Sequence, residues 1–110
     1  MKRPNLMARV ASATALTSVL LGGCAWVETT PQAEKVRIVP EDRVRDCTLR
    51  GTITTSTKAE VAGLTRNLRV VTQEVDDLAR LEAVDLNADT IVPQGPVSAG
   101  QRSYKAYRCL

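Results

Sequence analysis

Cys24 determines how much of this 110-residue chain is left to fold. It follows a basic N-terminus and an uncharged run of twelve residues, 10–21. A membrane-spanning helix needs about twenty mostly apolar residues, and this run is short and contains four serines and threonines. Such a segment, ending in small residues, is typical of a secretory signal peptide. We therefore predict that residues 1–23 are a signal peptide and are removed.

The residues around the predicted cut, Leu21-Gly22-Gly23-Cys24, match the cleavage and acylation box of bacterial lipoproteins. Small Gly23 lets a peptidase approach the backbone closely, and the Cys24 thiol is the nucleophile that takes a diacylglycerol. The freed amine can then take a fatty acid such as palmitate. One acyl chain alone binds a membrane reversibly, whereas two or three together prevent detachment. We predict signal cleavage between Gly23 and Cys24 and lipid attachment at Cys24; an uncleaved anchor extending to Val27 and a plain secretory signal are the alternatives.

The residues after Cys24 predict which membrane holds the protein and how far the folded part lies from it. In Gram-negative lipoproteins an aspartate directly after the cysteine commonly signals retention in the inner membrane. Ala25 therefore favours the outer membrane, with the protein on its periplasmic side. We predict that residues 24–35 form the lipidated cysteine and a short tether. Because eleven residues reach at most about 40 Å, the single domain predicted over residues 36–110 would lie close to its bilayer.

The charge of the mature chain excludes some classes of partner. The whole chain has 15 Lys and Arg against 12 Asp and Glu, and the three charged residues of the signal segment, Lys2, Arg3 and Arg9, are all basic. The mature chain is therefore neutral, although the sequence pI is about 9.0. A basic groove for nucleic acid is not predicted, and aromatic residues for base stacking are few. We expect attachment to a membrane through the lipid, and an envelope protein or cell-wall partner.

Cys47 and Cys109 remain as a pair once Cys24 carries lipid. In an oxidising compartment an even number of cysteines indicates a disulfide. The bond would close a loop of about 62 residues and stabilise the fold by roughly 4 kcal/mol in the chain-entropy model. A domain of this size buries a modest fraction of its surface, so a covalent link has a physical benefit. The alternative is a pair of buried free thiols.

The strongest local pattern is an apolar stripe with helical spacing between residues 64 and 78. Charged residues occupy the remaining faces; Asp76 and Arg80 are spaced to form a helical ion pair, and Asn87 can take the left-handed conformation that ends a helix. Two heptads are short for a coiled coil. We predict that this helix packs on a sheet of its own chain, with a partner-binding helix as the alternative. The stripe consists of Leu64, Leu68, Val71, Val75 and Leu78.

The segments on either side of this helix have strand character, because they alternate apolar and polar residues or are rich in β-branched ones. A helical turn is predicted at residues 40–44, where a proline and two acidic residues favour a helix start. The order strand, strand, helix, strand, strand predicts an α+β fold. In this fold one long amphipathic helix covers a small, mostly antiparallel sheet. The predicted strands are residues 36–39, 49–57, 90–92 and 103–109.

Several short motifs follow the basic signal segment and its box in a fixed order. They are Val36-Arg37-Ile38-Val39, Cys47, Leu49-Arg50-Gly51, Leu78-Ala79-Arg80, Ala88-Asp89-Thr90-Ile91-Val92-Pro93 and Tyr107-Arg108-Cys109. With them the chain resembles an uncharacterised proteobacterial family of envelope lipoproteins known only as a domain of unknown function. The resemblance covers most of the mature chain and implies an envelope lipoprotein without assigning an activity. Members often carry glycine where this chain has Asn87.

The long helix, the run 88–92 and a late cysteine are more distantly similar to the folded domain of the Rcs envelope-stress sensor lipoprotein. This similarity implies a periplasm-facing sensor that signals through a protein partner. That domain has four cysteines where this one has two. Its tether is long and proline-rich, whereas residues 24–35 are short, so the role of that tether is not expected here.

Catalytic and cofactor sites are not indicated. The chain has no histidine, which excludes histidine-based triads and histidine metal sites. Cys47 and Cys109 lack a Cys-x-x-Cys spacing, and two thiols alone do not complete a zinc site. Asp76 and Asp77 are neighbours on a helix and diverge by about 100°, and the glycines form no phosphate-binding loop. We predict no enzymatic activity, no cofactor and no metal.

The sequence as a whole predicts a non-enzymatic outer-membrane lipoprotein whose domain binds another envelope component as a structural or sensing module. The alternative is a redox-responsive envelope-stress sensor that uses a Cys47–Cys109 disulfide as its switch. A hydrolase or cell-wall-modifying enzyme is the third and least favoured class.

Overall fold

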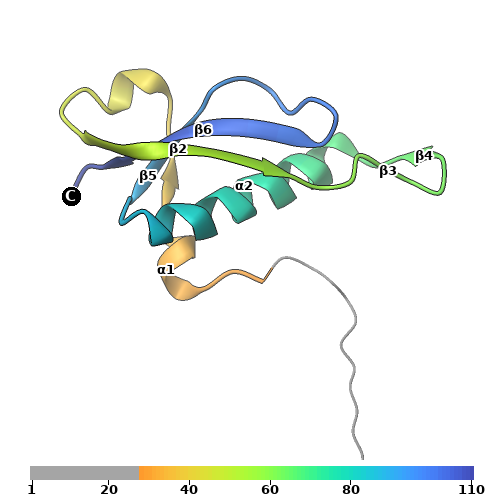
Figure 1. Cartoon of the computed structure of the whole chain (residues 1–110), viewed down its shortest axis with the longest axis horizontal. Coiled ribbons are helices and arrows are strands. Elements are labelled where there is room, and N and C mark those ends of the chain that lie inside the picture. The colour runs from red at the N-terminus through yellow and green to blue at the C-terminus, as the bar shows by residue number, and fades with distance from the viewer. Residues whose placement is uncertain (1–27) are drawn as a thin grey trace, which may run out of the picture.

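One long helix lies along one face of a four-stranded sheet in this protein (Figure 1). The computed structural model describes residues 28–110. The predicted signal peptide, the cleavage site and the lipid-attachment residue Cys24 therefore lie outside the described residues. The sheet has the order β1-β5-β6-β2. The elements are β1 (Arg37–Ile38), β2 (Thr48–Ser56), helix α2 (Leu68–Asp85), β5 (Thr90–Pro93) and β6 (Gln101–Arg108).

The sheet is mixed, so the α+β class is confirmed but the prediction of a mostly antiparallel sheet is wrong. β6 runs antiparallel to both of its neighbours, β5 and β2. The outer strand β1 is parallel to β5, with Arg37 opposite Thr90 and Ile38 opposite Ile91. The chain between these two strands passes through β2 and α2 before it returns. A parallel pair needs such a long crossover, and the order of elements alone does not reveal which strands become neighbours.

The core face of α2 differs from the predicted stripe. Its buried residues are Val71, Val75, Ala79 and Ala83, a strict four-residue spacing. Leu68 is the first residue of the helix and is exposed, and Leu64 precedes the helix altogether. The predicted stripe was chosen from the larger apolar residues. The residues of α2 that pack on the sheet include two small ones, Ala79 and Ala83, at the C-terminal end of the buried face.

Small residues on α2 bring the helix close to the sheet. Ala79 and Ala83 are fully buried and belong to one cluster with Ile91, Tyr104 and Ala106 of the sheet. Along β6, Tyr104 and Ala106 are buried while Lys105 between them is more exposed, as the two-residue period of a strand requires. The large Tyr104 side chain thus fills the space that the alanines leave.

The chain before β1 also belongs to the fold. Helix α1 (Pro31–Glu34) starts at Thr30, whose hydroxyl accepts a hydrogen bond from the backbone N–H of Ala33. Ala33 is fully buried, and α1 packs against α2. Part of the segment predicted as a tether is therefore folded. The turn predicted at residues 40–44 is confirmed as a short 3₁₀ helix, η1 (Glu41–Arg43).

A small hairpin between β2 and α2 was not predicted. Strands β3 (Glu60–Val61) and β4 (Leu64–Thr65) pair antiparallel and project past the end of the main sheet in Figure 1. Ala62 and Gly63 form its turn with φ of 53° and 80°, the positive values that a two-residue type I′ turn requires. Ala-Gly is a weak turn signal compared with Asn-Gly, so the sequence did not predict this hairpin.

None of the helices in residues 28–110 is both long enough and apolar enough to cross a membrane.

Gly100 joins the loop after β5 to the end of β2, and we expect its replacement to weaken the fold. Its φ is +75°, its carbonyl accepts the N–H of Thr57 at 2.8 Å, and a Cβ there would overlap the Thr57 carbonyl oxygen. Gly63 is the matched control, because its φ is +80° but nothing lies within 4 Å of a Cβ. Gly63→Ala should lower the free energy of unfolding by about 1–2 kcal/mol, and Gly100→Ala by clearly more. Equal losses in urea unfolding would contradict this account of the loop.

Candidate functional site

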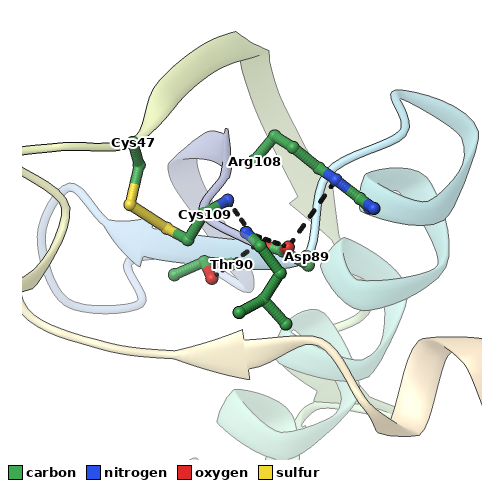
Figure 2. The surroundings of a disulfide bond; sticks show 6 residues. Cys47, Asp89, Thr90, Arg108 and Cys109 are labelled. Carbon is green, nitrogen blue, oxygen red and sulfur yellow. Dashed lines mark hydrogen bonds and ion pairs between the residues drawn. A yellow bond between two sulfur atoms is a disulfide. The ribbon is translucent and has the colours of Figure 1, made fainter.

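The two domain cysteines meet at one corner of the fold (Figure 2). Their sulfur atoms are within bonding distance and their Cα atoms are 4.4 Å apart, so the pairing predicted from the cysteine count is confirmed as a close pair. Cys47 lies between η1 and β2, and its N–H donates to the Val44 carbonyl at 3.1 Å. Cys109 directly follows β6. The link therefore joins the entrance of one edge strand to the end of a central strand.

Asp89 lies at the same corner and holds the end of the chain (Figure 2). Its Oδ1 accepts the backbone N–H of Cys109 at 2.8 Å and the hydroxyl of Thr90 at 2.9 Å. Its Oδ2 accepts the N–H of Leu110 at 2.9 Å and lies 3.8 Å from Nε of Arg108. All of these groups are donors or cations, so the carboxylate is matched to them only in its charged form.

The turn after α2 places Asp89 at this corner. Asn87 has φ of 58°, which confirms the left-handed position predicted for it. The N–H of Ala88 donates to Ala83 and that of Asn87 to Val84, the paired bonds of a Schellman motif. The backbone of Asp89 then reaches both neighbours of β5, since its N–H donates to Tyr107 and its carbonyl accepts from Arg37.

The surroundings of Asp89 lower the pKa of its carboxyl group. Burial acts in the opposite direction, because its side chain is only 16% exposed. The hydrogen bonds from the N–H groups of Cys109 and Leu110 and from Thr90, with the charge of Arg108, outweigh that burial. The carboxylate is thus charged and fully engaged, which suits a structural role better than that of a general base.

A hollow of about 320 Å³ opens next to this corner, between α1, the end of α2 and the C-terminus. Apolar side chains share its lining with the cations Lys35 and Arg108. Among residues 28–110, no serine, threonine, cysteine or histidine lines it. Such a lining can receive a side chain or small group of a partner but offers no hydroxyl or thiol nucleophile. Its residues are Gln32, Lys35, Val36, Val84, Asn87, Ala88, Asp89, Arg108 and Leu110.

A second polar cluster connects the middle of α2 to β6. The hydroxyl of buried Tyr104 donates to Asp76, and Arg102 donates to the same carboxylate at 3.1 Å. The guanidinium of Arg102 also lies 5.8 Å from the centre of the Tyr104 ring. Burial, and then the hydrogen bond to Asp76, raise the pKa of Tyr104 above its usual value. A buried tyrosine that keeps its proton stabilises the fold and does not serve as a base.

The ion pair predicted between Asp76 and Arg80 is wrong. Arg80 pairs instead with Asp77 at 2.9 Å, and its Nε donates to the Val36 carbonyl at 3.1 Å. The carboxylate of Asp76 instead accepts hydrogen bonds from Tyr104 and Arg102 of β6. The spacing on the helix allowed both partners, and the position of the sheet decided between them.

Within residues 28–110 no group of three or more histidine, cysteine, aspartate or glutamate side chains is placed to hold a metal ion.

The site residues predicted from the sequence divide into two groups. Cys47 and Cys109 are brought together, while Gly23 and Cys24 lie outside the described residues.

A family model described as a domain of unknown function, DUF4156, matches residues 27–109. The chain belongs to the DUF4156 family. The matched range includes both domain cysteines, Asp89 and every helix and strand described above. No curated protein and no solved structure matches the chain. The resemblance to a domain of unknown function is thereby confirmed, and the lipoprotein character and the similarity to the Rcs sensor stay predictions.

Asp89 is the residue of this DUF4156 domain whose importance sequence reasoning missed. In the sequence it stands in the motif 88–93, directly before the residues that form β5. The available signal was an aspartate followed by threonine directly after a left-handed helix end, where side-chain acceptors commonly bind nearby backbone N–H groups. The two backbone N–H groups that it binds are 20 and 21 residues away, so local spacing did not identify them.

We expect Asp89→Asn to destabilise the oxidised protein at neutral pH by about 2 kcal/mol, because hydrogen bonds to charged groups are worth about 1.5–3 kcal/mol. The folded pKa is lowered, so this stabilisation is present above the unfolded value of about 3.9 and is lost as the pH falls through the folded value. Urea unfolding at a series of pH values should show the gap between wild type and variant closing in acid.

Asp46→Asn is the matched control, because Asp46 is exposed and directly precedes Cys47. It should leave the free energy of unfolding nearly unchanged at every pH. A gap for Asp89→Asn that stays constant from neutral to acid pH would show that the charge of Asp89 contributes nothing.

Proposed function

We propose that this DUF4156 protein is a lipid-anchored module of the outer membrane, facing the periplasm, that binds another envelope component without catalysing a reaction. The observation that carries this proposal is the box Leu21-Gly22-Gly23-Cys24, which follows a basic N-terminus and an uncharged run of residues. The partner is an envelope protein or a cell-wall component. The Cys47–Cys109 pair acts as a structural link in this proposal.

The position of the folded part supports an anchor at Cys24. α1 begins at Pro31, so only a few residues separate the proposed lipid from the domain. Since each extended residue spans at most about 3.6 Å, the domain would stay within roughly 25 Å of the bilayer. A small domain held that close meets its partners at or near the membrane surface.

The polar interior of the domain supports binding rather than catalysis. Asp89 and Asp76 are both occupied by structural donors, and the carboxylate of Glu74 is bound by Arg66 and Thr57. The lining of the hollow beside the cysteine corner combines apolar side chains with the cations Lys35 and Arg108 and the carboxylate of Asp89. Small concave sites with a few polar groups are typical of ligand or partner recognition.

The anchor is tested with two matched substitutions at adjacent positions. Cys24→Ala removes the acylated thiol, so the protein should stay unprocessed or leave the membrane fraction while its domain still folds. Ala25→Asp keeps the thiol and should move the lipidated protein from the outer to the inner membrane. Fractionation of the envelope measures both, and a Cys24→Ala protein that is processed and still sediments with the outer membrane would overturn the proposal.

A redox-responsive envelope-stress sensor is the second candidate function. Both cysteines are partly exposed, so a reductant can reach them. The backbone N–H of Cys109 itself donates to Asp89, as does that of Leu110, and opening the link would loosen the end of β6. A regulatory disulfide in this position would therefore change the corner beside the hollow.

The reduction potential of the Cys47–Cys109 pair separates the two functions. A structural link should have a potential below about −300 mV, whereas a regulatory one should open near the poise of its compartment. We expect the structural value, measured by equilibration of the folded protein with thiol buffers. A value near about −200 mV would instead favour the sensor.

A further inference from the structure

The β3–β4 hairpin exposes large apolar side chains next to the start of α2. Val61 and Leu64 are directly opposite each other in the hairpin and therefore share one side of it. Leu68 follows as the first residue of the helix. The exposed fractions of the three residues are 52%, 73% and 65%. Single apolar residues are normal on a surface, but a group of them indicates an interaction site; we call Val61, Leu64 and Leu68 the hairpin patch.

The base of the hairpin is tied to α2 through side chains, which limits how far the patch can move. Arg66 directly follows β4 and makes two hydrogen bonds to Glu74 of α2, at 2.6 and 3.0 Å. Its guanidinium also donates to the carbonyl of Lys58 at 3.0 Å, which ties both ends of the hairpin together. Thr57 donates to the same glutamate at 2.9 Å. A surface that is ordered in advance loses little freedom when it binds.

Two features beside the patch fit the surface of a phospholipid bilayer. An apolar hollow of about 290 Å³ is lined by Leu68, Val71 and Val97 among others, and hydrocarbon is stabilised by burial in such a place. Glu60 of β3 is exposed and acidic, whereas the exposed side chains that precede and follow the hairpin in the chain, Lys58 and Arg69, are cations. Their stems can lie along apolar surface while their charges reach phosphate groups. Two cations and one acid leave this part of the surface with a net positive charge, which complements an interface with anionic headgroups.

The length of chain before α1 brings the patch within reach of the proposed anchor. The seven residue steps from Cys24 to Pro31 span at most roughly 25 Å. The chain then enters the fold beside Arg80 of α2, which donates to the Val36 carbonyl at 3.1 Å. Leu68 lies twelve residues earlier on that helix, about 18 Å along its axis. The bilayer that holds the lipid is therefore near enough to touch the patch.

We infer that the hairpin patch rests on the phospholipid surface in which Cys24 is anchored. The inference rests on the lipid anchor proposed above. The domain then contacts the membrane at two points, the lipid and the hairpin, and does not swing freely on its tether. This second contact fixes which face of the domain is presented to a partner.

The contact is tested with lipidated, full-length mature protein in vesicles of phosphatidylethanolamine and phosphatidylglycerol, with the Cys47–Cys109 link intact. A fluorophore is attached to Leu64→Cys or, as a matched control, to Thr52→Cys, an exposed position of β2. Brominated acyl chains in the vesicles should quench the label at position 64, and aqueous iodide should quench it poorly. The label at position 52 should show the opposite behaviour, with strong quenching by iodide and none by the brominated chains.

Any other outcome contradicts the proposed contact between the hairpin patch and the bilayer. If the vesicles carry the protein in flotation but both labels are quenched equally by iodide, the hairpin inference is wrong and the anchor stands. A label at position 64 that is shielded from iodide without quenching by brominated chains means that protein, such as a second copy of this chain, covers the patch. If the protein does not float with the vesicles, the anchor fails and the hairpin inference fails with it.

Discussion

The carboxylate of Asp89 makes the contacts on which the arrangement of the sheet depends. Asp89 directly precedes β5. Its carboxylate accepts hydrogen bonds from the backbone N–H groups of Cys109 and Leu110, directly beside the Cys47–Cys109 pair. β6 lies between β5 and β2, so the register of both neighbours depends on where β6 ends. A charged acceptor and a covalent link fix that end together. Because the loop closed by the cysteines spans 62 residues, the constraint reaches nearly the whole domain.

The close packing of α2 on the sheet explains how the polar groups inside the described part of the chain, residues 28–110, find their partners. Ala79 and Ala83 bring the helix near the sheet, and the buried Tyr104 ring fills the space between them. Its hydroxyl must then find a partner, which Asp76 supplies. The features left for function lie at the surface and at opposite ends of α2. The hollow is next to its C-terminal end, and the hairpin with its apolar patch is at its N-terminal end. In the proposed arrangement the hairpin end touches the membrane, while α1, which leads to the proposed anchor, lines the hollow at the other end.

Local signals in the sequence predicted those parts of the fold that depend on a few neighbouring residues. The main strands, the end of α2 at Asn87 and the helical turn near Glu41 all follow from side-chain type and short spacing. The pairing of Cys47 with Cys109 was predicted from the number of cysteines, because only these two remain if Cys24 carries lipid. The remaining features depend on contacts between distant segments. The parallel pairing of β1 with β5, the choice of Arg102 over Arg80 as the partner of Asp76, and the two donors that bind Asp89 are set by tertiary packing. The hairpin was missed because Ala62 takes a conformation that alanine seldom adopts.

Peptide mass mapping of the protein purified from the cells that produce it tests the division of the three cysteines most directly. We expect an N-terminal peptide that begins with Cys24 and carries a diacylglycerol and a fatty acid, together with a peptide in which Cys47 is joined to Cys109. A mature terminus without fatty acid, or a disulfide between Cys24 and one of the domain cysteines, would contradict the account.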